Sequence, residues 1–378
     1  MSPVIEYQYL LCRETPLFTM IGLPQAEGKY PAVIFRTPYV DSEIEKTEAE
    51  ICQQKLTEWA PWLENGYAVV SQHCRGRGKS GGDCIPYINE REDGLFLQDW
   101  VRQQPFYNGE IYLCGGSYLT SVHMVTAPFA PDIKGAVLEV QVSDRYTCNY
   151  RNGFYKMGLH GGWYVGMYKK NSIPVKPFAP ECYHMLPLSD FSKAVLGEPA
   201  PDFDEILRHP KRDDPFWLTR YGGGEARDAL KHARIPILIT TGFYDIYTGG
   251  IFDMWNDLDD ETKALSALAV QPYAHGGTPD GEPVCFEKGC LKENLPCYPM
   301  HWLNYIRGKE SAPFTPGKIT YYQLFGNQWR CDDFAPTKKE MVFPLGEGEK
   351  TYRYNPFAPA TFKGGLSANF GGKSSQRH

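Results

Sequence analysis

The chain has 378 residues, of which 42% are hydrophobic and 14% aromatic, so it can bury a large core and exceeds one typical domain. Its net charge of −6 and its pI of about 5.9 lack the basic surplus that nucleic-acid binding needs, which excludes nucleic acid as an expected partner. No stretch approaches the roughly 20 apolar residues of a membrane span, and the opening MSPVIEYQYLLCRETPLF has no basic segment followed by an apolar run. We therefore expect a cytoplasmic protein that does not bind a membrane.

Short apolar runs alternate with helical patterns over most of the chain. Strands are predicted at residues 31–39, 67–75, 111–117, 134–142, 235–242 and 265–273. Helices are predicted between early strands, at 53–65 and 90–104. Runs that are apolar on both faces are typical of a parallel sheet, because helices cover each side of it. This order of elements predicts an α/β fold with a mostly parallel central sheet.

The alternation is interrupted once and then ends. Between about Ser143 and Gly224, aromatic, Pro-rich and charged stretches replace the strands, which predicts an insertion between two strands of one sheet. Beyond Arg307, strand candidates without intervening helices predict a β-rich module; they lie at 318–325, 340–345 and 351–357. The predicted organisation is an α/β domain in two parts with an insertion and a C-terminal module, with bounds 1–143, 144–223, 224–308 and 309–378.

The stretch LCGGSYLTSVH at 113–123 indicates a strand, a sharp turn and a helix with Ser117 in the turn. Its two glycines permit backbone angles that other residues resist. The first N–H groups of the following helix would point toward one place beside the serine hydroxyl, where an oxyanion could form. Because the usual pattern is G-x-S-x-G and Leu119 stands at the last position, an ordinary glycine turn with a solvated serine is the alternative.

A serine hydroxyl needs a histidine base and a carboxylate to become a nucleophile, in the chain order Ser, Asp, His for this kind of turn. Asp245 lies three residues beyond the strand predicted at 235–242, and His275 lies directly beyond the next predicted strand. Taken singly, Asp245 could be a turn aspartate and His275 a loop histidine. Their joint position and order predict a catalytic triad of Ser117, Asp245 and His275.

Two other motifs predict less. HCRGRGKSGGD at 73–83 contains Gly-Lys-Ser, but a phosphate-binding loop needs glycine where His73 stands, so a structural loop beside the site is favoured. Cys285, Cys290, Cys297 and His301 lack the short Cys-x2-Cys spacing of zinc sites, so we expect no metal.

Motifs spread from about Lys29 to Cys331 resemble those of the CocE/NonD family of serine hydrolases, which includes X-prolyl dipeptidyl peptidases. They are GKYPAVIFRTPY, CRGRGKSGG, WVRQQPFYNG, GGSYL, LRHPKRDDPFW, GFYD, PYAHG and YYQLFGNQWR. In this family the serine pattern is similar to G-x-S-Y-x-G, so Leu119 is no departure. Thr120, which stands in place of the last glycine, is one.

The resemblance implies an α/β-hydrolase fold in which the insertion is a helical cap and the C-terminal module is an incomplete jelly roll. It implies Ser117 as nucleophile, His275 as general base and Asp245 as its partner. It also implies an oxyanion hole formed by the backbone N–H of Tyr118 and the phenol of Tyr39. Because too few residues follow for a whole jelly roll, we expect partial docking of the module and weak self-association.

These observations predict a serine hydrolase that cleaves a small-molecule acyl ester, or an amide, through an acyl-enzyme intermediate without a cofactor. An X-prolyl-type peptidase or an acyltransferase with the same triad is the alternative among enzymes. The alternative outside enzymes is a catalytically silent relative that binds a ligand or partner in the cap, which Thr120 and the short C-terminal module support.

Overall fold

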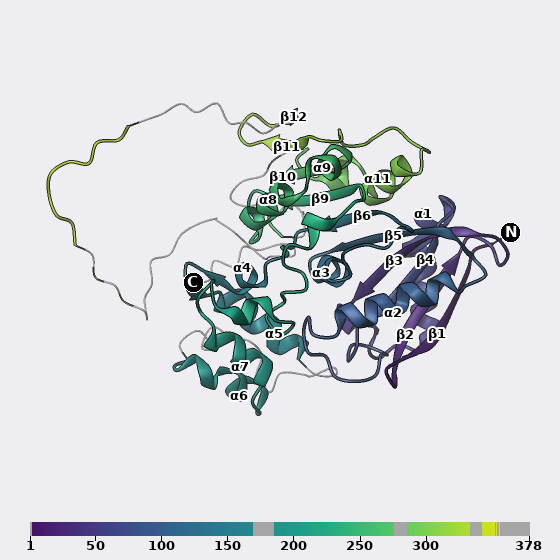
Figure 1. Ribbon diagram of the computed structural model, residues 1–378, viewed down its shortest axis with the longest axis horizontal. Helices are drawn as coiled ribbons and strands as arrows, with labels where there is room; N and C mark the ends of the chain where they lie inside the picture. Colours follow the sequence, from purple (N-terminus) through teal and green to yellow (C-terminus); the bar gives the residue numbers. More distant parts are fainter. Residues whose placement is uncertain are drawn as a thin grey trace.

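The computed structural model describes residues 2–168, 185–275, 286, 288–332, 342–351, 353 and 355. A ten-stranded sheet runs through this part of the chain (Figure 1). Its strands are β1 Val4–Cys12, β2 Thr15–Leu23, β3 Tyr30–Thr37, β4 Ala68–His73, β5 Tyr107–Gly116, β6 Ile133–Glu139, β9 Ile237–Gly242, β10 Ala267–Gln271, β11 Ile319–Gln323 and β12 Gln328–Asp332. The predicted mostly parallel sheet is confirmed.

The strand order is β1-β2-β4-β3-β5-β6-β9-β10-β11-β12. The seven strands from β4 to β11 in this order are parallel to their neighbours, whereas β1, β2 and β12 pair antiparallel. Since parallel strands all end at the same edge of a sheet, the loops after β3, β5, β9 and β10 meet there.

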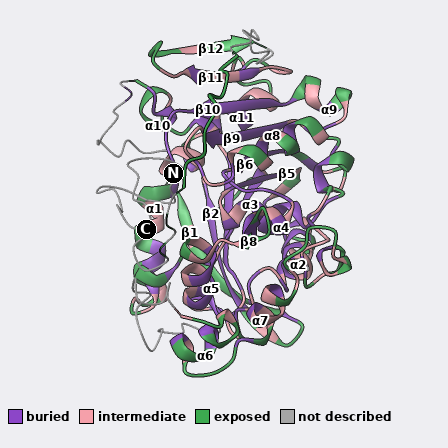
Figure 2. Cartoon of the chain, turned by 90° about the vertical axis from the view of Figure 1, so that its left-hand side faces the viewer, coloured by how far each residue is buried: buried purple, intermediate pink, exposed green. Residues whose placement is uncertain are grey.

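Helices cover both faces of the sheet. They are α1 Glu48–Glu64, α2 Glu90–Arg102, α3 Tyr118–Met124, α8 Thr248–Asp257, α9 Asp260–Leu265, α10 Leu291–Asn294 and α11 Tyr298–Ile306. Alternate residues of the central strands enter two separate cores: Ile239 of β9 belongs to the core that contains residues of α2 and α8, while Leu238 belongs to the core that contains residues of α1 and α11. Figure 2 shows the resulting buried centre and the more exposed edge strand β12.

The segment between β6 and β9 is mainly helical, as expected for the insertion. It contains α4 Arg145–Asn149, β7 Tyr150–Arg151, β8 Phe154–Tyr155, a π-helix Met157–Gly161, α5 Gly162–Met167, α6 Phe191–Leu196 and α7 Pro201–Arg208. Its aromatic side chains form a core of their own around Tyr164, Phe203 and Trp217. The domain boundaries at 144–223 stay a prediction.

The structure differs from the sequence prediction at both ends of the sheet. The hairpin β1–β2 was not predicted. Strand β11 pairs parallel with β10, with Leu268 opposite Ile319, so residues 319–332 extend the central sheet. The bounds 309–378 of the C-terminal module stay a prediction. Residues 342–345 of the predicted strand 340–345 are exposed and have no strand structure. Most of the predicted strand 351–357 lies outside the described residues.

None of the described helices is long and apolar enough to cross a bilayer.

Candidate active site

Ser117 lies between the end of β5 and the start of α3, in a backbone conformation that is unusual for a residue with a side chain. Its φ is 56° and its ψ is −125°, and such conformations cost about 1–3 kcal/mol and persist only when their surroundings enforce them. Of the two preceding glycines, Gly115 is required, because a Cβ there would lie 2.3 Å from the Cβ of Leu119. The turn therefore holds the serine hydroxyl away from the sheet, at the start of a helix.

The structure brings the three predicted triad residues together. His275 Nε2 lies 3.0 Å from Ser117 Oγ, and His275 Nδ1 lies 2.7 Å from Asp245 Oδ2. Asp245 is completely buried, and His275 is nearly so. The backbone N–H of Tyr247 donates to the other oxygen of Asp245 at 2.7 Å. When the Nδ1–H of His275 donates a hydrogen bond to Asp245, Nε2 carries the lone pair that can accept the proton of the serine hydroxyl.

The two predicted oxyanion donors also lie at this position. The Tyr39 hydroxyl is 3.3 Å from Ser117 Oγ. The backbone N–H of Tyr118 lies close enough to the Tyr39 phenol to act on its pKa. Although 41% of Tyr39 is exposed, its hydroxyl lies among protein atoms, and this desolvation raises the pKa of the phenol. The phenol therefore remains a hydrogen-bond donor at neutral pH.

The side chain of Tyr118 is fixed behind the turn by a buried ion pair. Its hydroxyl donates to Glu90 Oε1 at 2.8 Å and accepts from the backbone N–H of Tyr87 at 2.8 Å. Arg36 Nη1 lies 2.7 Å from Glu90 Oε2. Because each of these groups is paired, the first residue of α3 cannot rotate without breaking a buried network.

Thr120 is accommodated without a clash at the position where glycine was expected. The residue is fully buried. Its Oγ1 lies 2.7 Å from the carbonyl oxygen of Gly115 and 2.8 Å from that of Glu139, and it accepts from the backbone N–H of Glu139 at 2.9 Å.

A histidine that sequence reasoning missed contacts the loop carrying Asp245. His160 belongs to the π-helix of the insertion, and its Nε2 lies 3.0 Å from the hydroxyl of Tyr247. The ring of Tyr247 in turn meets the ring of His275 edge-on, with centroids 5.6 Å apart. Burial, followed by the charge of Lys156, lowers the pKa of His160 to about 3. A short π-helix often marks a functional site, but it can be recognised only in the structure, because it has no sequence signature.

The Gly-Lys-Ser segment is engaged in internal contacts. Lys79 Nζ donates to the carbonyl of Ile44 at 3.2 Å, and Ser80 Oγ donates to that of His73 at 2.8 Å. Arg77 donates to the carbonyl of Pro38 at 3.1 Å, directly before Tyr39. These contacts support the structural interpretation of this loop.

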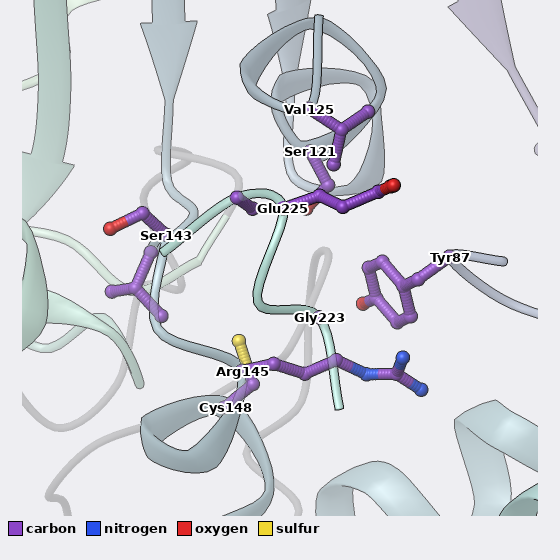
Figure 3. A pocket seen from close by; sticks show the side chains of 10 residues that line it. Tyr87, Ser121, Val125, Ser143, Arg145, Cys148, Gly223 and Glu225 are labelled. Carbon is purple, nitrogen blue, oxygen red and sulfur yellow. The ribbon is translucent and has the colours of Figure 1, made fainter. Parts of the chain in front are cut away.

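A small cavity lies between α3, the helix that follows Ser117, and the insertion (Figure 3). It is lined by Tyr87, Ser121, Val125, Val142, Ser143, Arg145, Cys148, Gly223, Glu225 and Ala226. The guanidinium of Arg145 lies 4.4 Å from the centre of the Tyr87 ring. The space open to a water molecule is about 20 Å³, enough for one water and too little for an acyl group.

The cysteine and histidine set considered for zinc is not brought together over the described residues. Cys290 is buried, Cys297 is exposed, and His301 Nδ1 lies 2.6 Å from Glu310 Oε2. Cys285 lies outside the described residues. Within the described part of the chain, no group of three candidate ligands is placed to hold a metal ion.

Comparisons with known proteins bear on the family and the fold of this chain. The profile of the family described as X-Pro dipeptidyl-peptidase (S15 family) matches residues 15–277. Cocaine esterase of Rhodococcus sp. (strain MB1 Bresler) is 21% identical over 392 residues, covering 90% of this chain and 66% of the esterase.

Among solved structures, an α-amino-acid ester hydrolase superposes with a TM-score of 0.68 at 19% identity, covering 89% of this chain and 59% of that one. A CocE/NonD family hydrolase from Staphylococcus aureus gives a TM-score of 0.59 at 19% identity, covering 88% of this chain and 56% of that one. The chain thus spans less than two thirds of each of these proteins. These likenesses confirm the α/β-hydrolase fold and the resemblance predicted from the motifs.

Proposed function

The chain belongs to the X-Pro dipeptidyl-peptidase (S15) family and is a serine hydrolase, and from that premise we propose that it cleaves acyl esters through Ser117, His275 and Asp245. The observation that carries the proposal is the continuous pair of contacts from Ser117 Oγ to His275 Nε2 and from His275 Nδ1 to Asp245. Three side chains from loops far apart in the sequence meet in the order that proton transfer requires.

In the first half of the reaction, Ser117 Oγ attacks the carbonyl carbon of the substrate while its proton passes to His275 Nε2. Negative charge develops on the former carbonyl oxygen, which accepts hydrogen bonds from the Tyr39 phenol and the Tyr118 N–H. The tetrahedral species collapses as the bond to the leaving group breaks, and His275 returns the proton to the departing oxygen or nitrogen. The product is an ester between Ser117 and the acyl group.

In the second half, water takes the place of the leaving group. His275 removes a proton from the water, the hydroxide attacks the acyl carbon, and the proton returns to Ser117 Oγ as the acid leaves. Asp245 stabilises the imidazolium in both halves, because its carboxylate faces Nδ1 and is itself held by the Tyr247 N–H. None of these steps uses a cofactor.

The substrate class is proposed as a small-molecule acyl ester, with an amide as the second choice. The name of the matched family favours a peptide bond, whereas cocaine esterase, with its alignment over 90% of this chain, favours an ester. Both reactions share the acyl-enzyme, and so does acyl transfer to an alcohol. Turnover of 4-nitrophenyl acetate, of an X-prolyl 4-nitroanilide, and of the acetate ester with added alcohol distinguishes the three.

The assignment of the nucleophile is tested by covalent labelling with a fluorophosphonate, located by mass spectrometry of the digested protein. We expect one label on Ser117 and none in Ser117→Ala. Ser121→Ala is the matched control, because Ser121 lies one turn further along the same helix and should leave labelling unchanged. Labelling that persists in Ser117→Ala contradicts the triad, and absence of labelling and of turnover in the natural chain supports the silent relative.

A further inference from the structure

The strained backbone of Ser117 needs contacts that prevent it from relaxing. Its own N–H donates to the carbonyl oxygen of Glu139, at the end of β6, over 2.9 Å. This bond ties the amide of Ser117 to β6, while the side chain of Tyr118 is held on the side of Glu90 and α2. A second attachment between α3 and β6 would further define the direction of the serine hydroxyl.

The hydroxyl of Thr120 makes this second attachment. Its single proton can reach either the carbonyl of Gly115 in β5 or the carbonyl of Glu139 in β6, while its oxygen accepts from the Glu139 N–H. The same Glu139 oxygen thus faces both the Ser117 N–H and the Thr120 hydroxyl. Glycine at this position would have none of these contacts.

The end of β6 is itself rigid, so it can serve as an anchor. The side chain of Glu139 is held by the hydroxyls of Tyr298 and Thr240, the latter at 3.2 Å. The next residue, Val140, donates its N–H to the carbonyl of Thr240 in β9 at 2.9 Å. A group tied to Glu139 is therefore tied to the middle of the central sheet.

We propose that Thr120 is a positioning residue for the reaction: its buried hydroxyl, hydrogen-bonded to the backbone of Gly115 and Glu139, holds the turn so that Ser117 Oγ points at His275. The inference rests on the proposed function, since it assumes that Ser117 is the nucleophile. On this proposal, threonine in place of the expected glycine helps to position the nucleophile and does not indicate lost activity.

The test compares Thr120→Val, which keeps the shape and removes the hydroxyl, with Thr120→Ser, which keeps the hydroxyl. With 4-nitrophenyl acetate, kcat of Thr120→Val should fall about 10- to 100-fold, the scale of a small misplacement of the reacting atom, while KM stays within about twofold. Thr120→Ser should keep kcat within about threefold. The rate of fluorophosphonate labelling at Ser117 should follow kcat.

The matched control is Thr126→Val, two residues beyond the end of the same helix, where a buried threonine hydroxyl donates to the carbonyl of His123 at 2.7 Å. It should cost similar stability and leave kcat unchanged. Urea unfolding of every variant, measured at the assay temperature, shows that all of them are folded during the assay. If Thr120→Val does not fold, Thr120→Gly serves instead and should also lose kcat.

Equal kcat in Thr120→Val and the natural chain overturns the inference, as does an equal loss in Thr120→Ser and Thr120→Val, or a gain in Thr120→Gly. These results leave the proposed function intact as long as Ser117 is still labelled. Failure of the proposed function has its own signature, which is labelling or turnover that survives Ser117→Ala.

Discussion

Two hydroxyl-bearing side chains act on Ser117 in different ways. The hydroxyl of Thr120 contacts the backbone of the sheet at Gly115 and Glu139, whereas the hydroxyl of Tyr39 lies 3.3 Å from Ser117 Oγ itself. The first affects where the nucleophile points, and the second affects how well the developing charge is stabilised. Substitutions at the two positions should therefore have different kinetic and chemical consequences.

Tyr39→Phe should lower kcat about 10²- to 10³-fold, which is the range for removal of one oxyanion donor. KM should change little, because the ground-state carbonyl attracts the phenol less than the oxyanion does. Steady-state kinetics with an acyl ester measure this. Tyr9→Phe is the control, since its hydroxyl contacts Glu48 on another part of the molecule. An unchanged kcat in Tyr39→Phe would show that the phenol is not a donor.

The charges near the site favour acyl groups without a free α-amine. The residues after Asp245 are Ile246, Tyr247 and Thr248, which carry no negative charge. Burial, and after it the charges of Lys156 and Arg145 in the insertion, lowers the pKa of His160, whose partner Tyr247 contacts His275. A substrate ammonium would be repelled there.

We therefore expect kcat/KM for phenylacetyl esters to exceed that for matched phenylglycine esters by about tenfold near pH 7, a difference of about 1.4 kcal/mol. Raising the pH above the pKa of the substrate amine should reduce the gap, because the repulsion then disappears. A preference for the phenylglycine ester would refute this reading of the site.

At the scale of elements, the sequence predicted well those strands whose residues are buried on both faces. The runs at 67–75 and 235–242 became β4 and β9, with every residue buried. The turn at Ser117 was predictable because two glycines directly after an apolar strand permit the backbone angles that a sharp turn requires. His160 and β1 were missed, because a π-helix has no sequence signature and the outward residues of β1 include tyrosine and leucine, which blur its alternation.

Strand β11 was predicted as a strand, but its partner was not, since nothing in KITYYQLF specifies which edge it joins. Its side chains show that it is integral to the fold. Tyr322 is fully buried and packs with Phe286 and Trp329. Its neighbour Tyr321 points to the other face and contacts Asp332 at a more exposed place.

Tyr322→Ala should accordingly lower the free energy of unfolding by about 3–5 kcal/mol, as for other large aromatic residues in a core. Tyr321→Ala is the control and should cost much less. Urea unfolding followed by far-UV circular dichroism gives both values. Equal, small effects would indicate that β11 belongs to a separate module after all.

At the scale of the whole molecule, two deeply buried histidines link stability to pH. Burial lowers the pKa values of His123 and His160 to about 3, from 6.5 for an ordinary histidine. Between pH 6.5 and 4.5 the unfolded chain binds protons that the folded chain does not, so stability falls as the pH falls. The carboxyl groups with lowered pKa values, such as those of Asp93 and Asp132, act mainly below this window.

The free energy of unfolding should therefore decrease between pH 6.5 and 4.5 with a slope of up to about 1.4 kcal/mol per pH unit for each histidine. His123→Gln should remove about half of the slope, and substitution of the exposed His232 should leave it unchanged. Urea titrations across this range measure it. A slope that is the same in His123→Gln and the natural chain would contradict the assignment.

The insertion between β6 and β9 leaves and re-enters the sheet at adjacent strands. Glu139 at the end of β6 lies opposite Thr240, and Ile237 at the start of β9 lies opposite Ala136. The two ends of this long excursion therefore lie on neighbouring strands, one strand spacing across and three residues along, or about 11 Å apart. The entropy of closing a loop changes by only about 0.6 kcal/mol for each doubling of its length. The stability of the sheet and its strand order therefore depend little on the length of the segment between β6 and β9. A segment of quite different size and composition could be exchanged there, which makes it the natural place for substrate range to diverge while the chemistry stays the same.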